Sequence, residues 1–158
     1  MKRYEKINQA ILKAWEKGDP ETRVSRYRTY EGEGIALTYK NGAAMALVPD
    51  VCCPFNFDQL TKQVREQNVQ TILDHLLPRL EDSKYPLTGR SEKEDKRTLV
   101  QIKSHDREVW VDQKLLTIFG TSPEFRLEAS SNNYPLIAVY VEENLVGVVC
   151  PVRRKNEA

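Results

Sequence analysis

The sequence predicts an α+β fold made of two like-built halves, each with a helix followed by about three antiparallel strands. Apolar residues near the N-terminus recur at helical spacing, and short runs that alternate apolar and polar residues occur in both halves. We expect a single domain, with halves over about residues 1–81 and 98–154 and with the helices packed on one face of the sheet.

The first predicted element is an amphipathic helix over residues 3–17, where Tyr4, Ile7, Ile11 and Trp15 form the apolar stripe. The stretch Gly-Asp-Pro at 18–20 ends this helix. Three strands are then expected, over residues 22–30, 34–40 and 43–49. The dipeptide Asn41-Gly42 predicts a hairpin between the last two strands, because a type I′ turn needs positive φ at both central positions.

The middle of the chain contains a helical segment followed by a polar segment. Residues 57–81 have a helical pattern whose apolar face shifts at Gln67-Asn68, which predicts two short helices or one bent helix. Residues 82–97 are polar and rich in charge, and they include Pro86 and Gly89. We expect this stretch to be a solvated connector between the two halves.

The second half repeats the alternating pattern of the first. Strands are expected over residues 98–103, 107–111, 125–129, 136–141 and 145–152. A short helix is expected over residues 112–119, with Asp112 as its N-cap and Gly120 after its end. A turn is expected at residues 130–133.

Composition and charge exclude several classes of protein. No run of apolar residues approaches the length of a membrane span, and the first residues lack the apolar core of a signal peptide. Charged residues are 30% of the chain and nearly balanced, at a net charge of +1, which excludes a generally basic nucleic-acid coat. Three cysteines do not make a disulfide framework, so we expect a soluble, cytoplasmic protein.

Positive charge is concentrated at the two ends of the chain. Residues 1–30 carry a net charge of +4 and residues 153–158 a net charge of +2. Along the first helix and the residue before it, four lysines fall within an arc of about 60° opposite the apolar stripe: Lys2, Lys6, Lys13 and Lys17. This lysine face fits either a phosphate backbone or, as is commoner, an ordinary solvated helix surface.

No catalytic, metal or cofactor signature is present in the sequence. His75 lies in a leucine-rich helical segment, and His105 lies between a serine and an aspartate in a turn, where sequence neighbours cannot form a triad. The histidines and Cys52-Cys53 do not match a metal-ligand spacing. We therefore predict no catalytic residue, no bound metal and no cofactor, and we expect the adjacent cysteines to pack as small apolar residues.

The C-terminal third resembles the end of a bacterial DNA polymerase III sliding clamp, the beta subunit. The matching features are the Leu115-Leu116 pair, the strands around residues 125–140, and a last strand that ends in Cys150, Pro151, Val152 and Arg153. The first half is similar to a clamp half-domain over residues 11–49. Cys150 and Val152 stand where the family has methionines, and a clamp chain has three such domains, whereas this one has room for one.

The resemblance implies two surfaces. Clamp helices face the DNA backbone, which would give Lys2, Lys6, Lys13 and Lys17 the role of sequence-neutral DNA contacts. The family's terminal motif lines a groove for peptides of replication proteins, which would place Cys150, Pro151, Val152 and Arg153 in that groove. A core strand ending in proline explains the same four residues equally well.

Two functions are therefore expected, and both are non-enzymatic. The first is a clamp-like protein that binds duplex DNA, a replication protein or both, and that forms a homo-oligomer if it builds a ring. The second is a small protein–protein adaptor or inhibitor, of the type found in mobile elements, that does not bind nucleic acid. An exposed apolar patch near residues 52–57 or 149–152 would indicate the second function.

Overall fold

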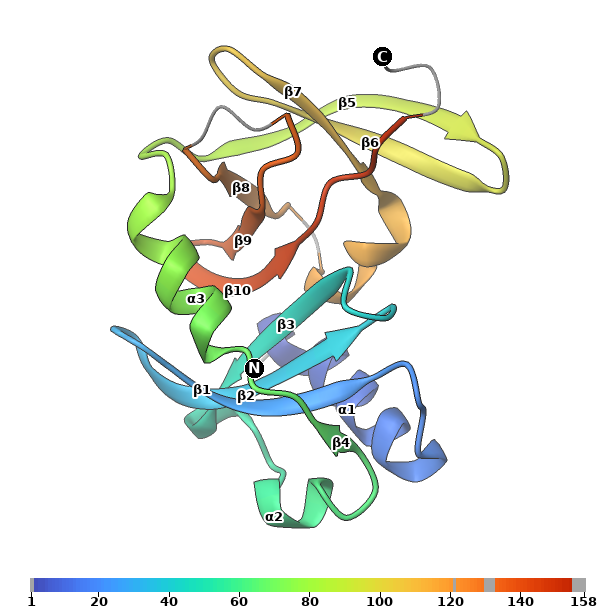
Figure 1. Ribbon diagram of the computed structural model, residues 1–158, viewed down its shortest axis with the longest axis vertical. Coiled ribbons are helices and arrows are strands. Elements are labelled where there is room, and N and C mark those ends of the chain that lie inside the picture. The colour runs from blue at the N-terminus through green and yellow to red at the C-terminus, as the bar shows by residue number, and fades with distance from the viewer. Residues whose placement is uncertain (1, 121, 130–132, 155–158) are drawn as a thin grey trace. The chain divides into compact units, whose positions relative to one another are not determined.

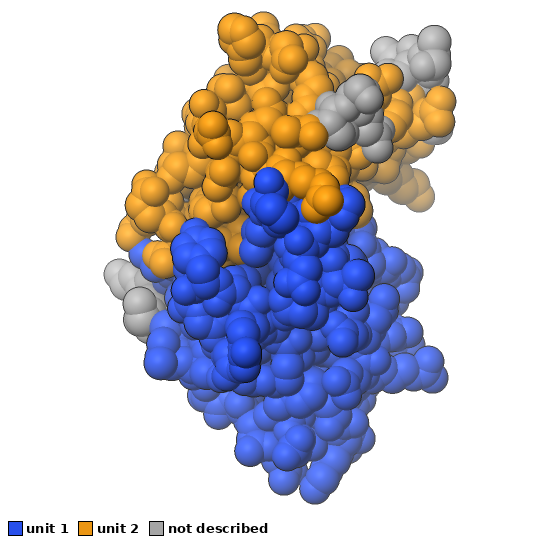
Figure 2. All heavy atoms as spheres, turned by 60° about the vertical axis from the view of Figure 1, so that its left-hand side comes forward, with its two compact units in different colours: residues 1–78 blue, residues 79–158 orange. Residues whose placement is uncertain are grey.

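The computed structural model describes residues 2–120, 122–129 and 133–154, which belong to two compact units, residues 1–78 and 79–158 (Figure 2). Strands occur in both units and α-helices accompany them in the first, so the predicted α+β class is confirmed (Figure 1). No helix among the described residues is long and apolar enough to cross a membrane. The predicted turn at 130–133 falls largely on residues outside this description.

Unit 1 is a four-stranded sheet with three α-helices. Its elements are α1 (Glu5–Lys17), β1 (Arg23–Thr29), β2 (Gly32–Tyr39), β3 (Ala44–Pro49), α2 (Phe57–Leu60), β4 (Arg65–Glu66) and α3 (Gln70–Leu76). The strand order is β4-β1-β2-β3, and the β1–β2 and β2–β3 pairs are antiparallel. Helix α1 packs against β3, and α3 packs against β1.

Helix α1 confirms the first predicted element. Tyr4, Ile7 and Ile11 of the predicted stripe are buried, because apolar residues three and four positions apart share one helix face. Trp15, predicted as part of the same stripe, is 39% exposed, and Ala14 is buried instead. Gly18 ends the helix in the left-handed conformation at φ 58°, and its amide donates to the Ala14 carbonyl at 2.8 Å.

The meander β1–β2–β3 also forms as predicted, with one shift in the hairpin turn. The residues with positive φ are Lys40, Asn41 and Gly42, at 52°, 55° and 90°. The Gly42 amide donates to the Tyr39 carbonyl, so the central pair of the turn is Lys40-Asn41 rather than the predicted Asn41-Gly42. The glycine follows the turn and returns the chain to β3.

Gly34 leaves room in the sheet of unit 1 for the buried side chain of Tyr27. Gly34 is the register partner of Tyr27, and a Cβ atom at Gly34 would lie 2.7 Å from the Tyr27 hydroxyl and 2.8 Å from Cα of Pro49. Any larger residue would force backbone atoms apart. The close fit buries Tyr27, and this burial raises the pKa of its hydroxyl well above the ordinary value.

The predicted helical segment 57–81 is only partly helical. Helix α2 has four residues, a short parallel strand β4 pairs with β1, and α3 starts at Gln70, after the break predicted at Gln67-Asn68. The chain is extended at β4 because the outer edge of β1 needs hydrogen-bond partners, and the Gln67 amide donates to the Val24 carbonyl there. The spacing of apolar residues along the sequence does not reveal that β4 pairs with β1.

Unit 2 consists of two antiparallel meanders, separated by two short 3₁₀ turns over Gln113–Leu115 and Thr117–Phe119. Its strands are β5 (Tyr85–Glu94), β6 (Arg97–Lys103), β7 (Glu108–Asp112), β8 (Glu124–Leu127), β9 (Ile137–Val141) and β10 (Asn144–Val149). The strand order is β10-β9-β8-β5-β6-β7. Beyond β10, the Val152 amide donates to the Trp110 carbonyl of β7 at 2.8 Å.

Three predictions for this part of the chain are wrong. Residues 82–97 are not a solvated connector, because most of them form β5, which pairs with β6 and belongs to unit 2. The halves are also not built alike, since unit 2 contains no α-helix among its described residues. The predicted helix 112–119 is a pair of 3₁₀ turns, although Asp112 accepts the Lys114 amide at 3.0 Å as a cap does.

Candidate protein-binding surfaces

The segment between β3 and α2 is the most apolar exposed part of unit 1. We call residues 51–57, with the sequence VCCPFNF, the apolar loop. It carries no charge, and none of its seven residues is buried. The side chain of Val51 is 93% exposed, whereas both phenylalanines and both cysteines are half-buried. An exposed apolar cluster of this kind is typical of a surface that binds another molecule.

Three polar contacts hold the apolar loop in place. At its start, Nη1 and Nη2 of Arg26 each donate to the Asp50 carboxylate at 2.7 Å, and this hydrogen bonding lowers the pKa of Asp50. In the middle, the Asn8 amide donates to the Cys52 carbonyl at 3.0 Å. At its end, the Asn56 side chain accepts the Gln59 amide and caps α2. The loop therefore presents its apolar side chains from a fixed backbone.

Helix α1 extends this apolar surface. Asn8 contacts the apolar loop, and Trp15 donates from its indole nitrogen to the Gln59 carbonyl at 3.3 Å, so one side of α1 borders the segment 52–59. Leu12 lies on that same side, between Asn8 and Trp15. Leu12 and Trp15 remain 42% and 39% exposed. We define the apolar surface as Leu12, Trp15 and the apolar loop.

The cysteines in the apolar loop do not have the environment of a nucleophile. Cys52 and Cys53 form no disulfide, and burial raises the pKa of the Cys53 thiol. Burial likewise raises the pKa of Cys150. Among the described residues, no group of three His, Cys, Asp or Glu is placed to share a metal ion. The apolar loop therefore suits packing against a partner better than covalent chemistry.

The lysine face of α1 points to solvent. Lys6, Lys13 and Lys17 are exposed, and none of them forms an ion pair with another described residue. They lie away from the side of α1 that borders the apolar loop. The side chain of Lys2 is outside the described part of the structure. DNA binding by these lysines stays a prediction.

The terminal motif continues β10 as an extended segment. Cys150, Pro151 and Val152 are half-buried, and the exposed Arg153 places its guanidinium 5.7 Å from the centre of the Tyr134 ring. Through its amide, Val152 pairs with β7. The assignment of these four residues to a peptide groove stays a prediction.

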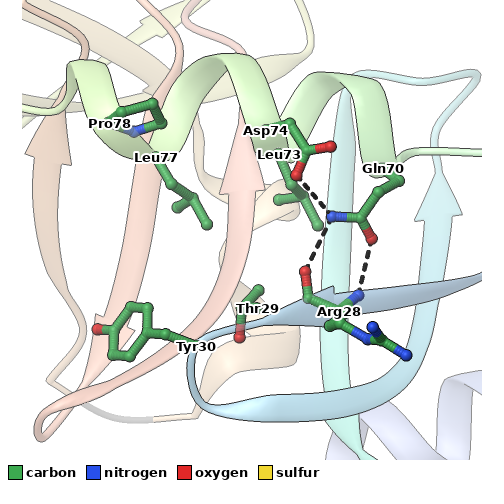
Figure 3. A pocket seen from close by; sticks show the side chains of 8 residues that line it. All are labelled: Arg28, Thr29, Tyr30, Gln70, Leu73, Asp74, Leu77 and Pro78. Atoms are coloured by element: carbon green, nitrogen blue, oxygen red, sulfur yellow. Dashed lines mark hydrogen bonds between the residues drawn. The ribbon is translucent and has the colours of Figure 1, made fainter.

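The structure adds a groove in unit 1 that the sequence did not predict (Figure 3). It has a volume of about 700 Å³ and lies between the end of β1 and α3, with the apolar side chains of Leu73 and Leu77 on one side and Tyr30 on the other. At its polar end, the Gln70 amide group accepts from the Arg28 amide at 2.7 Å and donates to the Arg28 carbonyl at 2.9 Å.

The contacts of Gln70 explain why the groove escaped prediction. Its side chain makes the two hydrogen bonds that a neighbouring strand would make, and it also donates to Asp74 at 2.8 Å. In the sequence, the only visible signals are an aromatic residue, Tyr30, in a polar turn and the spacing of Leu73 and Leu77 along one helix face. Neither signal relates residue 28 to residue 70.

Comparison of the chain with models of known protein families, with curated proteins and with solved structures gave no match. The resemblance to the sliding clamp therefore stays a prediction, and functional inference depends on the surfaces described above.

Proposed function

We propose that this chain is a non-enzymatic protein-binding module that docks one protein partner through the apolar surface. The observation that carries the proposal is the apolar loop, seven uncharged residues of which none is buried, next to a half-exposed tryptophan. This is the apolar patch near residues 52–57 that was expected of an adaptor or inhibitor.

The energetics favour docking at this surface. Covering a nearly fully exposed valine side chain contributes about 1.5–3 kcal/mol, and the half-exposed aromatic side chains add further apolar area. Aromatic residues are enriched where binding energy is concentrated in protein interfaces. The contacts of Asp50, Cys52 and Asn56 hold the loop before binding, so little ordering entropy is lost when a partner covers it.

A nuclease-treated capture experiment tests this proposal. The full chain, immobilised, is expected to retain one protein from a lysate of its source cells, and Val51→Asp is expected to abolish that retention. Ile72→Asp is the matched control, because Ile72 is a half-exposed branched residue on α3, away from the apolar loop. Equal retention by the chain and the Val51→Asp variant, or retention that depends on nucleic acid, would overturn the proposal.

A second candidate function is sequence-neutral binding of duplex DNA, favoured by three exposed lysines without an ion-pair partner among the described residues. In this hypothesis the chain acts in a clamp-like assembly with helices on one sheet face, alone or with a replication protein. Counterion release gives a salt slope of about −0.9 per phosphate contacted. A gel shift at low salt, with Lys6, Lys13 and Lys17 changed to Glu, tests the binding, and light scattering tests for a ring-sized homo-oligomer.

A further inference from the structure

The segment after β10 lies in unit 2, where one backbone hydrogen bond joins it to β7. The Val152 amide donates to the Trp110 carbonyl at 2.8 Å, on the edge of β7 that faces away from β6. Two residues later, the Arg154 side chain is only 14% exposed. The end of the described chain is therefore held by one backbone hydrogen bond and by the side chain of Arg154.

The arginine occupies a site built from β5 and β7. Its guanidinium carbon lies 4.6 Å from the centre of the Trp110 ring. The Nη1 atom of Arg154 contacts Glu92 at 2.7 Å, and its Nε atom lies 3.4 Å from Glu94. Arg90 lies 5.4 Å from the same ring and 3.8 Å from Glu92, so a second cation borders the site.

The chemistry of this site is specific for a guanidinium group. A planar guanidinium stacks on an indole and donates to two carboxylates at once, whereas a lysine ammonium has neither the plane nor the fork. Glu92 and Glu94 also contact Arg90 and Arg97, at 3.8 and 3.2 Å, so the arginine that enters the site completes a mixed-charge cluster. The Trp110 carbonyl, which accepts the Val152 amide, adds a requirement for an extended backbone.

We propose that the β7 edge, Trp110, Glu92 and Glu94 form a binding site for extended arginine-bearing peptides, which residues 152–154 fill in cis. A partner segment with a backbone amide two residues before an arginine makes the same contacts and displaces the cis segment. This site lies in unit 2 and is independent of the apolar surface, so it goes beyond the proposed function.

Occupation in cis controls access to the site. A tethered segment competes at an effective concentration in the millimolar range. A peptide in trans with the same contacts is therefore excluded from the unchanged chain unless it binds far more tightly. Removing the arginine of the cis segment vacates the Trp110 ring and the two glutamates, and it leaves one backbone hydrogen bond, from Val152, for the peptide to displace.

Fluorescence anisotropy tests the proposal. The probe is a fluorescein-labelled peptide with the sequence of residues 148–155, carrying Cys150→Ser to avoid oxidation. We expect the full chain with Arg154→Ala to bind it at least tenfold more tightly than the unchanged chain does. The chain with Arg153→Ala is the matched control and is expected to bind like the unchanged chain, because Arg153 lies over Tyr134 instead. Adding Glu92→Gln and Glu94→Gln to Arg154→Ala is expected to abolish binding.

Two outcomes overturn the proposal. One is that the folded Arg154→Ala chain does not bind 1 mM peptide, which makes the contact a purely structural one. The other is equal binding with and without the two glutamates. If the Arg154→Ala chain does not fold, Arg154→Lys replaces it, because lysine keeps the positive charge but lacks the planar guanidinium that stacks on Trp110. The same tenfold gain in affinity is then required of the Arg154→Lys chain.

Discussion

The apolar loop of unit 1 and strand β5 of unit 2 are both exposed, but for opposite reasons. β5 carries charge that finds partners, since Glu92 and Glu94 contact Arg154, and Glu94 also pairs with Arg97 at 3.2 Å. The apolar loop carries no charge, and polar contacts hold its backbone while none of its side chains is fully buried. An exposed charged strand is ordinary for a protein surface, whereas a fixed, exposed apolar loop leaves hydrophobic area that a partner can remove from water.

The sharpest contrast is between two valines. Val111 of β7 is fully buried, and Val51 of the apolar loop is 93% exposed. Val111→Ala is expected to lower the free energy of unfolding by about 2 kcal/mol, because it removes buried methyl groups and leaves a cavity. Val51→Ala is expected to change it by less than about 0.5 kcal/mol. Urea unfolding of both variants measures the difference, and equal losses would mean that Val51 has a structural role.

A substitution at the outer edge of β1 is expected to lower the free energy of unfolding by a smaller amount. Gln70→Ala removes both hydrogen bonds to the Arg28 backbone and is expected to cost about 1 kcal/mol. Amide hydrogen exchange at Arg28 is expected to accelerate, while exchange in β2 stays slow because its pairing with β1 and β3 is intact. Unchanged exchange at Arg28 would show that the Gln70 side chain does not protect this edge.

Low pH is expected to weaken one ion pair in each unit, Arg26–Asp50 in unit 1 and Arg154–Glu92 in unit 2. Hydrogen bonds from Arg26 and Arg154 lower the pKa values of Asp50 and Glu92 below those of the unfolded chain. Such groups stabilise the fold above their unfolded pKa, and this stabilisation is lost as the pH falls through the folded pKa. We expect the apolar loop and residues 152–154 to loosen below about pH 4, with the effect absent between pH 6 and 8. Two-dimensional NMR across this pH range measures the loosening of both segments. Spectra that do not change at pH 3 would contradict the role of these ion pairs.

Local pattern predicted the fold where the determining contacts are local. Helix α1 and the strands β1 to β3 follow from apolar spacing and turn residues, and each has a partner nearby in the chain. β5 was misread because its charge density suggests disorder, although its strand partner β6 follows it directly in the chain. The short strand β4 was missed for a different reason, since its partner β1 precedes it by about forty residues.

The candidate surfaces were predictable to different degrees. The lysine face and the apolar segment near residue 52 are visible in the sequence, because each is a continuous or periodic pattern. Two features depend instead on packing between segments that are distant in the sequence. One is the contribution of Leu12 and Trp15 to the apolar surface, and the other is the arginine site on Trp110. Residue type alone did not distinguish Arg153 from Arg154, although only Arg154 contacts Trp110.

The central claim is that the apolar surface binds a protein, and titration calorimetry with the purified partner tests it most directly. We expect a negative heat-capacity change on binding, since apolar area leaves water. For Val51→Asp we expect an affinity at least tenfold lower at an unchanged melting temperature, and for Ile72→Asp an unchanged affinity. Equal affinity of the unchanged chain and the Val51→Asp variant for the partner would contradict the account.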